Sequence, residues 1–356
     1  RAAYAVYGEV AIPVLDNLEV DLKIRRDHYN DFGNATTPQL SIGFRPIDSL
    51  LLRASFGEGF RAPSMGQLYS GGSQSFNGGI DFVRCNQLVP GNVVASGNTV
   101  TVTDSAANEA CATTQYQNIQ GGNPGLAAEE SEQFGVGAVW SPTSDLTLTL
   151  DYYDIDLTDE IAILPMNNIF KAEFLGQSAG SAVRRQANGT VLLVDRRNNN
   201  IAERRTSGID FGAVYNFSIG NAGDFRANFQ TTYVNEMERR LAGDSEFARL
   251  EQTFDPDYRA ALSLDWSRGD FGATLVGNHI DKTSFSDDSA NLDSWTTFDL
   301  QVSYATPWNG RVVVGARNIT DEDPPIDLVG LDSPYYSNGL HDIYGRVPYV
   351  RYEQDL

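Results

Sequence analysis

The sequence predicts an all-β protein, an antiparallel β-barrel wall whose strands cross a membrane. Three observations lead to this prediction. Apolar and polar residues alternate with a period of two along most of the chain. Short and long connections follow one another in strict alternation, and aromatic residues recur beside the short ones. No stretch approaches the ~20 consecutive apolar residues that a membrane helix needs, which excludes a helical membrane protein.

The composition narrows the class of protein further. The 356 residues include 47 Asp and Glu but only 26 Lys and Arg, so the formal net charge is −21. A nucleic-acid-binding protein needs a basic surface, so we expect no nucleic-acid partner. The 33 glycines, 16 tyrosines and 18 phenylalanines suit turns and strands better than helix packing.

The period-two alternation is clearest in the segment from residue 18 to residue 25. Its apolar positions are Leu18, Val20, Leu22 and Ile24, and its polar positions are Glu19, Asp21, Lys23 and Arg25. Each such strand has one apolar face that stays free of charge for about the 9–11 residues that cross a bilayer when tilted. The other face carries charges that need water or a polar plug opposite them, as in a large barrel.

Thirteen segments follow this pattern, and each is predicted to be one strand. They are residues 3–14, 17–28, 38–46, 49–60, 130–141, 145–157, 205–218, 223–236, 256–267, 270–280, 294–306, 309–319 and 343–352.

The connections between these strands differ in length. The short ones are Pro13–Asn17, Pro46–Ser49, Ser141–Asp145, Gly220–Asp224, Ser267–Asp270 and Thr306–Gly310. The long ones are His28–Thr37, Arg61–Ala128, Thr158–Arg204, Glu236–Asp255, Asp281–Asp293 and Thr320–Asp342. Short periplasmic turns and long extracellular loops are what a bacterial outer-membrane barrel requires. A soluble β-sandwich shows the same alternation within strands, but it does not require short connections at one end of the strands and long ones at the other.

Aromatic residues cluster beside the short turns, where an interfacial girdle is expected in a membrane barrel. They are Phe44, Trp140, Phe217, Phe225, Trp266, Phe271, Tyr304 and Trp308. The alternative is the general enrichment of aromatic residues in strands.

The two cysteines, Cys85 and Cys111, lie in the same long, polar connection. In an oxidising compartment they are predicted to form a disulfide, which would restrict the unfolded loop. The alternative is a pair of free thiols.

Several short motifs occur in a fixed order along the chain. They are Gly59-Phe60-Arg61-Ala62-Pro63-Ser64 with Leu68-Tyr69, Asn123-Pro124-Gly125-Leu126 with Glu129 and Ser131, Ser207-Gly208-Ile209-Asp210, Arg317-Asn318-Ile319-Thr320-Asp321-Glu322, and Gly345-Arg346. Pro63 and Pro124 end strands by removing a hydrogen-bond donor, and Gly208 permits a bulge or a close approach. Together these motifs resemble those of TonB-dependent outer-membrane receptors.

The resemblance implies a barrel of roughly twenty-two strands. Residues 1–356 would then be the C-terminal portion of one outer-membrane barrel domain, with no plug domain present. The resemblance also implies a bacterial outer-membrane location, with lipid and lipopolysaccharide around the barrel. Coupling to the TonB energy complex would pass through an N-terminal plug.

No nucleophile elbow, phosphate loop or zinc spacing occurs, so we expect no enzyme, no cofactor and no metal centre. His28, His279 and His341 are interpreted as surface or loop residues. The acidic connections Asp281–Asp293, with Asp287-Asp288, and Asp321–Asp332 carry oxygen ligands suitable for calcium. Neither has an EF-hand spacing, so solvated acidic loops are the favoured interpretation.

Ligand recognition is expected where the long loops meet. One candidate is a group of arginines that would hold an anionic ligand: Arg184, Arg185, Arg196, Arg197, Arg204 and Arg205. Ion pairs with acidic loops or with lipopolysaccharide phosphates are an equal alternative. The other candidates are aromatic residues suited to stacking: Tyr69, Phe76, Tyr116, Tyr335 and Tyr336. Packing at the barrel rim would explain them as well.

The motifs therefore predict a TonB-dependent importer of a small-molecule or oligosaccharide ligand. A passive porin is the first alternative, and a secreted carbohydrate-binding β-sandwich is the second. Iron chelates, oligosaccharides, peptides and cobalamin all remain candidate cargoes.

Overall fold

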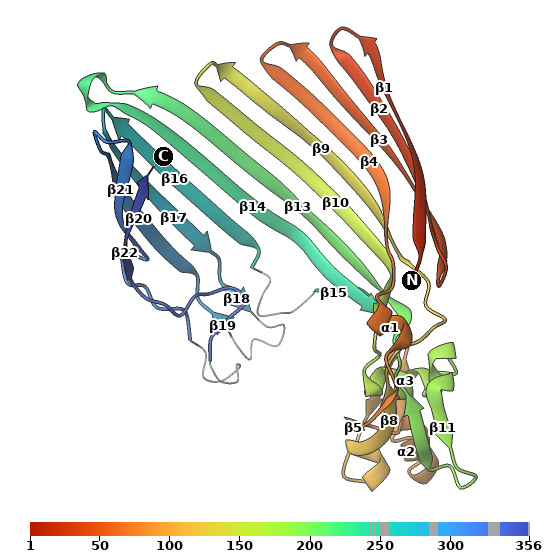
Figure 1. The fold of residues 1–356 in the computed structure, drawn as a ribbon. Helices are drawn as coiled ribbons and strands as arrows, with labels where there is room; N and C mark the ends of the chain where they lie inside the picture. Colours follow the sequence, from red (N-terminus) through yellow and green to blue (C-terminus); the bar gives the residue numbers. More distant parts are fainter. Residues whose placement is uncertain (243, 245, 250–255, 285–290, 327–334, 355–356) are drawn as a thin grey trace.

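The computed structural model describes residues 1–242, 244, 246–249, 256–284, 291–326 and 335–354. Its main feature is one large antiparallel sheet of fourteen strands (Figure 1). Thirteen of them follow one another in sequence order along the sheet, and the fourteenth, β15 (Ala248–Arg249), pairs with β14.

The thirteen predicted strands are all present. They are β1 (Ala3–Leu15), β2 (Leu18–Tyr29), β3 (Gly33–Ile47), β4 (Leu50–Arg61), β9 (Glu129–Thr143), β10 (Leu146–Ala162), β13 (Asn199–Ser218), β14 (Asp224–Leu241), β16 (Tyr258–Arg268), β17 (Phe271–Ile280), β20 (Trp295–Ala305), β21 (Gly310–Arg317) and β22 (Val347–Gln354).

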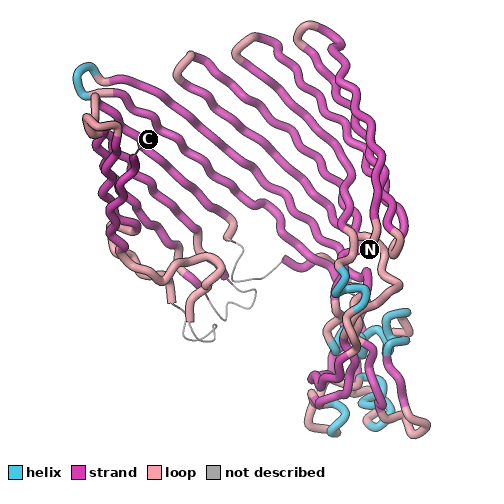
Figure 2. The backbone as a smooth tube through the Cα atoms, viewed as in Figure 1, coloured by secondary structure: helices cyan, strands magenta, loops and turns pink. Residues whose placement is uncertain are grey.

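Short turns lie at one end of this sheet and the longer connections at the other (Figure 2). We call these the turn end and the loop end. One predicted long connection is wrong, because β2 and β3 continue their pairing to Tyr29 and Gly33 and leave only residues 30–32 between them. Gly33, with φ of +112°, allows this tight reversal.

The strand registers place the apolar side chains in rows across the sheet. One row runs through Ile12, Val20, Ile42, Ala54, Val136, Tyr152, Ile209, Tyr233 and Tyr258. Many residues of this face are exposed; Val136 is 44% exposed and Ile209 is 41% exposed. A continuous exposed apolar surface of this kind marks a face that is covered by lipid or by another protein.

Charged side chains occupy the opposite face. Arg53 of β4 donates two hydrogen bonds to Asp151 of β10, at 2.8 and 2.6 Å. Lys23 of β2 forms an ion pair with Glu9 of β1 at 2.8 Å. The alternation predicted from the sequence therefore separates the two faces of the wall.

The sheet is open within the part of the chain that the structure describes. There, β1 pairs with β2 alone and β22 pairs with β21 alone. The two edge strands do not pair with each other.

Residues 62–128 and 163–198 fold together into one body at the loop end, which we call the loop subdomain (Figure 1, lower right). Its sheet has the order β11-β12-β8-β5, and β6 and β7 form a separate hairpin. Its elements are α1 (Met65–Tyr69), β5 (Ser73–Gly79), α2 (Phe82–Leu88), β6 (Val93–Ser96), β7 (Thr99–Val102), η1 (Glu109–Cys111), β8 (Thr114–Gln120), α3 (Met166–Phe174), η2 (Ser178–Ala182), β11 (Val183–Arg185) and β12 (Val191–Asp195).

The larger apolar core lies in this subdomain rather than in the sheet. It consists of Phe82, Cys85, Val93, Cys111, Leu164, Met166, Ile169, Phe170 and Val194. Residues from both long connections contribute to it, so neither connection can bury its apolar side chains alone. Gly79 is required at this packing, because a Cβ there would lie 2.5 Å from Cγ of Met166.

The remaining elements are small. They are the turn η3 (Gly220–Ala222) and the pair β18 (Thr283–Ser284) and β19 (Asn291–Leu292). Within the described ranges, no helix has the length and apolar character needed to cross a membrane.

Candidate functional site

Two of the sequence motifs meet where the sheet joins the loop subdomain. Arg61 at the end of β4 donates two hydrogen bonds to the carboxylate of Glu129 at the start of β9. The same carboxylate accepts a hydrogen bond from the backbone N–H of Ile161 at 2.8 Å. Leu68, Leu126 and Ile161 pack beside them as a second buried apolar cluster. We call these five residues the rim clamp.

Asn123 and the three consecutive asparagines at residues 198–200 form hydrogen bonds between the first and the second long connection. Asn123 Nδ2 donates to the backbone oxygen of Asn198 at 2.9 Å, and Asn198 Nδ2 donates to Gly121 O at 3.1 Å. Asn200 donates to Ala127 O and to Asp159 O. Sequence reasoning missed residues 198–200, although a run of three asparagines beside two arginines is a visible turn signal.

The remaining motifs also have structural roles. The pairing of β13 with β14 shifts between Ser207 and Gly208, so a bulge, one of the two alternatives that the sequence left open at Gly208, is present. Asn318, with φ of 44°, closes the turn after β21 by hydrogen bonding to both backbone groups of Glu322. Asp321 accepts a hydrogen bond from the backbone N–H of Arg346 at 2.7 Å, which positions the segment before β22.

The predicted arginine group separates into two kinds. Some of these arginines are held by carboxylates: Arg185 by Asp81 and Glu173, Arg204 by Glu160, and Arg205 by Asp156. Burial alone would lower the pKa of Arg185, but the hydrogen bonds that Arg185 donates to Glu173 and Asp81 outweigh this and raise its pKa above the ordinary value. The two carboxylates occupy the guanidinium group of Arg185 and leave it little capacity for a ligand. Arg204 keeps a buried Nε without a hydrogen-bond partner among the described residues, and the side chain of Arg205 is 52% exposed.

The other arginines line a cavity of about 360 Å³, which we call the arginine cavity. Its walls include Arg184 of β11 and Asp195, Arg196 and Arg197 at the end of β12. Arg197 pairs with Asp195 at 2.6 Å, whereas no carboxylate pairs with Arg184 or Arg196 among the described residues.

Arg196 is the most constrained of these side chains. Its Nε donates to the backbone oxygen of Leu164 at 2.9 Å, while its buried Nη1 has no hydrogen-bond partner. Burial lowers its pKa, because no counter-charge compensates the lost hydration.

The predicted aromatic residues do not form one site. Tyr69 and Phe76 are exposed on the loop subdomain, whereas Tyr116 packs edge-on against Phe170 of the core with ring centroids 4.9 Å apart. Tyr335 and Tyr336 belong to the connection between β21 and β22, which is not part of the loop subdomain.

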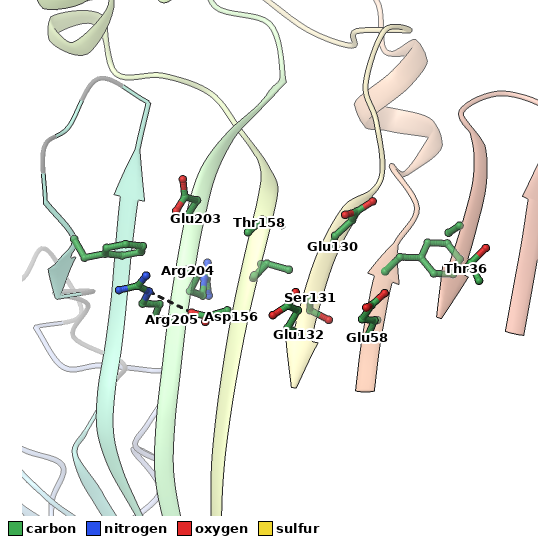
Figure 3. A pocket seen from close by; sticks show the side chains of 15 residues that line it. Thr36, Glu58, Glu130, Ser131, Glu132, Asp156, Thr158, Glu203, Arg204 and Arg205 are labelled. Carbon is green, nitrogen blue, oxygen red and sulfur yellow. Dashed lines mark ion pairs between the residues drawn. The ribbon is translucent and has the colours of Figure 1, made fainter. Parts of the chain in front are cut away.

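A second cavity, of about 400 Å³, lies across β4, β9, β10 and β13 near the loop end (Figure 3). Glu58, Glu132, Asp156 and Arg205 follow one another in register across these strands. Alternate side chains of a strand lie on the same face, so these four residues lie on the apolar face of the wall, with Phe134 and Ile209. They lie closer to the loop end than the apolar rows do. Acidic residues outnumber the arginines Arg204 and Arg205 in the lining of this cavity, whereas three arginines and one aspartate line the arginine cavity. The arginine cavity is therefore the better candidate for an anionic ligand.

Histidines and acidic loops give no sign of a metal centre in the described ranges, where no three His, Cys, Asp or Glu side chains gather to hold an ion. His341 is buried against Trp295, and His28 and His279 make hydrogen bonds near strand ends. Asp287-Asp288 and residues 327–332 of the acidic connections lie outside the described residues.

The comparisons with known proteins agree with this architecture. The family described as "TonB dependent receptor-like, beta-barrel" matches residues 1–319. The chain belongs to this family of outer-membrane receptors and transporters. No curated protein matches the chain in sequence.

Solved structures share the fold at low sequence identity. The siderophore receptor PirA from Acinetobacter baumannii has a TM-score of 0.68 and 17% identity, over 99% of this chain and 45% of that chain. The ferric enterobactin receptor PfeA from Pseudomonas aeruginosa has a TM-score of 0.67 and 15% identity, over 98% and 45%. The copper transporter OprC has a TM-score of 0.59 and 15% identity, over 99% and 48%. This chain thus spans under half the length of each of these structures.

Proposed function

We propose that the complete protein is a TonB-dependent outer-membrane receptor that imports a scarce ligand and catalyses no reaction. The observation that carries the proposal is family membership over residues 1–319, together with a wall that has one apolar and one charged face. The long connections at the loop end would face the outside of the cell and the short turns the periplasm. Iron chelates, oligosaccharides and other small ligands remain candidate cargoes.

The two alternatives are less well supported. A secreted carbohydrate-binding sandwich would bury the apolar face of one sheet against another, whereas here that face is exposed along the sheet. A passive porin shares the wall but has no need of the motifs that build the rim clamp. The family therefore favours the gated importer over the open pore.

We also propose that residues 1–356 are the C-terminal portion of one larger barrel domain. The open edges of β1 and β22 support this, because a membrane barrel has no free strand edge. In the full-length protein, the amides of β1 should exchange with deuterium as slowly as those of β2. In residues 1–356 alone they should exchange much faster. Equal, slow exchange in both would show that this chain closes a barrel by itself.

Lipid, lipopolysaccharide and the TonB complex are the partners implied by the proposal. The apolar rows would contact lipid, and Arg205 and Arg240, both stacked on Phe247, would lie close to lipopolysaccharide phosphates. Contact with TonB would be made by a plug domain. The outer-membrane location is tested by fractionation, because detergent should be needed to extract the protein from that membrane.

Planar-bilayer conductance of the full-length protein separates the importer from the porin without knowledge of the cargo. A plugged receptor should show no steady conductance and should bind the periplasmic domain of TonB in detergent. A large, constant conductance without TonB binding would support the porin instead.

A further inference from the structure

The arginine cavity lies where the loop subdomain meets the ends of β13 and β14. Both long connections contribute to its wall, since Asn123 comes from the first and Arg184 and Arg196 come from the second. Ile201 of β13 and Ala242, which follows β14, complete it. The cavity therefore forms only when the subdomain is folded against the sheet.

The charge of this cavity is opposite to that of the whole chain. Three arginines and one aspartate line it, and Asp195 is already paired with Arg197. Arg184 and Arg196 are left without a carboxylate partner among the described residues, in a protein whose net charge is −21. The hydrogen bond from Arg197 lowers the pKa of Asp195, and the charge of Arg184 helps to lower it, but Arg184 forms no ion pair with Asp195. The buried and unpaired Nη1 of Arg196, beside a second guanidinium group, favours an anion at this place.

Part of the cavity wall is apolar. Leu164 and Ile169 belong to the buried core and line the cavity, as do Ala179 and Ala182. A fully hydrated inorganic ion gains nothing from these apolar side chains. A ligand with an apolar body and a single anionic group would satisfy both surfaces.

We propose that the arginine cavity binds a small amphipathic organic anion, with its carboxylate on Arg184 and Arg196 and its apolar part on Leu164 and Ile169. The planar guanidinium group suits a carboxylate because two N–H donors can meet its two oxygens. The cavity volume of about 360 Å³ limits the ligand to a small molecule or to one arm of a larger one. The role of this cavity in recognising cargo rests on the proposed import function. The binding of an organic anion in the cavity does not depend on that function.

Titration calorimetry on the full-length protein in detergent tests the site with defined probes. The probe is 4-phenylbutyrate, and its neutral amide has nearly the same shape without the charge. We expect the carboxylate to bind about ten-fold more tightly than the amide and more weakly as salt is raised. Inorganic phosphate should bind more weakly than 4-phenylbutyrate.

The variants Arg184→Gln and Arg196→Gln should each weaken binding of 4-phenylbutyrate about ten-fold. Arg268→Gln, at a turn at the opposite end of the sheet, should bind it like the unchanged protein. Because Arg196 also binds Leu164 O, Arg184→Gln is the decisive variant, since the Arg184 side chain forms no hydrogen bond or ion pair with the described residues.

Equal binding of the acid and its amide, or unchanged binding in Arg184→Gln, would overturn the site. Tighter binding of phosphate than of 4-phenylbutyrate would also overturn it, in favour of a phosphate site. A protein that binds the probe at these arginines but conducts like a porin would refute the import function and keep the site.

Discussion

Arg185 binds Asp81 across 104 residues of sequence, with Nη2 to Oδ1 at 2.7 Å. The same guanidinium group also binds Glu173 at 2.6 Å. Asp81 belongs to the first long connection, and Glu173 and Arg185 belong to the second. This one side chain therefore joins two loops that the sequence presents as separate.

Replacing Arg185 should destabilise the loop subdomain. Arg185→Met leaves Asp81, which is almost fully buried, and Glu173 without their counter-charge, which should cost about 3–5 kcal/mol. Hydrogen exchange of residues 62–128 and 163–198 in the full-length protein would measure this loss. The matched variant Arg184→Met, at the exposed neighbouring position, should change stability by no more than about 0.5 kcal/mol. Equal effects of the two variants would contradict the cross-linking role of Arg185.

The disulfide between Cys85 and Cys111 is present, as the sequence predicted, and both sulfurs are buried in the core of the loop subdomain. Cys85→Ser combined with Cys111→Ser should lower the stability of this subdomain by roughly 3–4 kcal/mol. Proteolysis under non-denaturing conditions should then cut within residues 62–128 while the sheet stays intact. Mass spectrometry of non-reduced protein from the native membrane provides the independent check, and two free thiols there would be the contrary result.

Gly208 should not tolerate a side chain. A Cβ at this position would lie 2.6 Å from the backbone oxygen of Tyr233 and 2.4 Å from the hydroxyl of Tyr153. Gly208→Ala should therefore cost about 1–3 kcal/mol, because the bulge cannot move away without breaking the ladder. Gly212→Ala on the same strand is the control, since its nearest neighbour would be 3.7 Å away. The resistance of the folded barrel to heat in detergent would compare the two, and equal melting would argue against close packing at Gly208.

The two faces of β10 should respond differently to a charge. Leu150 is exposed on the apolar face, and Leu150→Arg should destabilise the barrel by about 2–4 kcal/mol if it lies near the middle of the bilayer. Thr149→Arg places the same side chain on the charged face, where Arg53 and Asp151 already lie, and should be tolerated. Folding yields into lipid vesicles would measure the difference. A spin-label scan that finds Thr149 rather than Leu150 in the acyl chains would reverse the assignment.

His341 should make the last long connection sensitive to acid. Burial lowers its pKa from 6.5; its ring packs against Trp295, and the charge of Arg259 also disfavours protonation. The unfolded segment therefore takes up a proton at a higher pH than the folded one. Stability should be constant above about pH 6.5 and fall as the pH drops below it. Hydrogen exchange of residues 337–346 against pH would show this fall. The variant His341→Gln should remove most of the pH dependence, and an unchanged profile in that variant would assign it to another group.

The strands could be predicted from the sequence because their signal is local. In β2, the alternation of Leu22 with Lys23 indicates which side chain lies on the apolar face of the wall, and a slip of one residue would reverse it. Because each neighbouring strand has the same pattern, few registers keep all apolar side chains on one face. The sequence of each strand therefore predicts its place in the wall. The prediction failed at the connection after His28, because the sequence there has no alternating pattern that indicates the continued pairing of β2 with β3.

The loop subdomain was decided only by the tertiary structure. Its core joins Phe82 and Phe170, and nothing near either residue in sequence indicates the other. The arginines show the same limit, since Arg184 and Arg185 are adjacent, yet one lines a cavity and the other is held by two carboxylates. A local pattern determines which face of a strand a side chain takes. Whether a charged side chain meets a counter-charge or a cavity depends on a distant part of the chain, and only folding brings the two together.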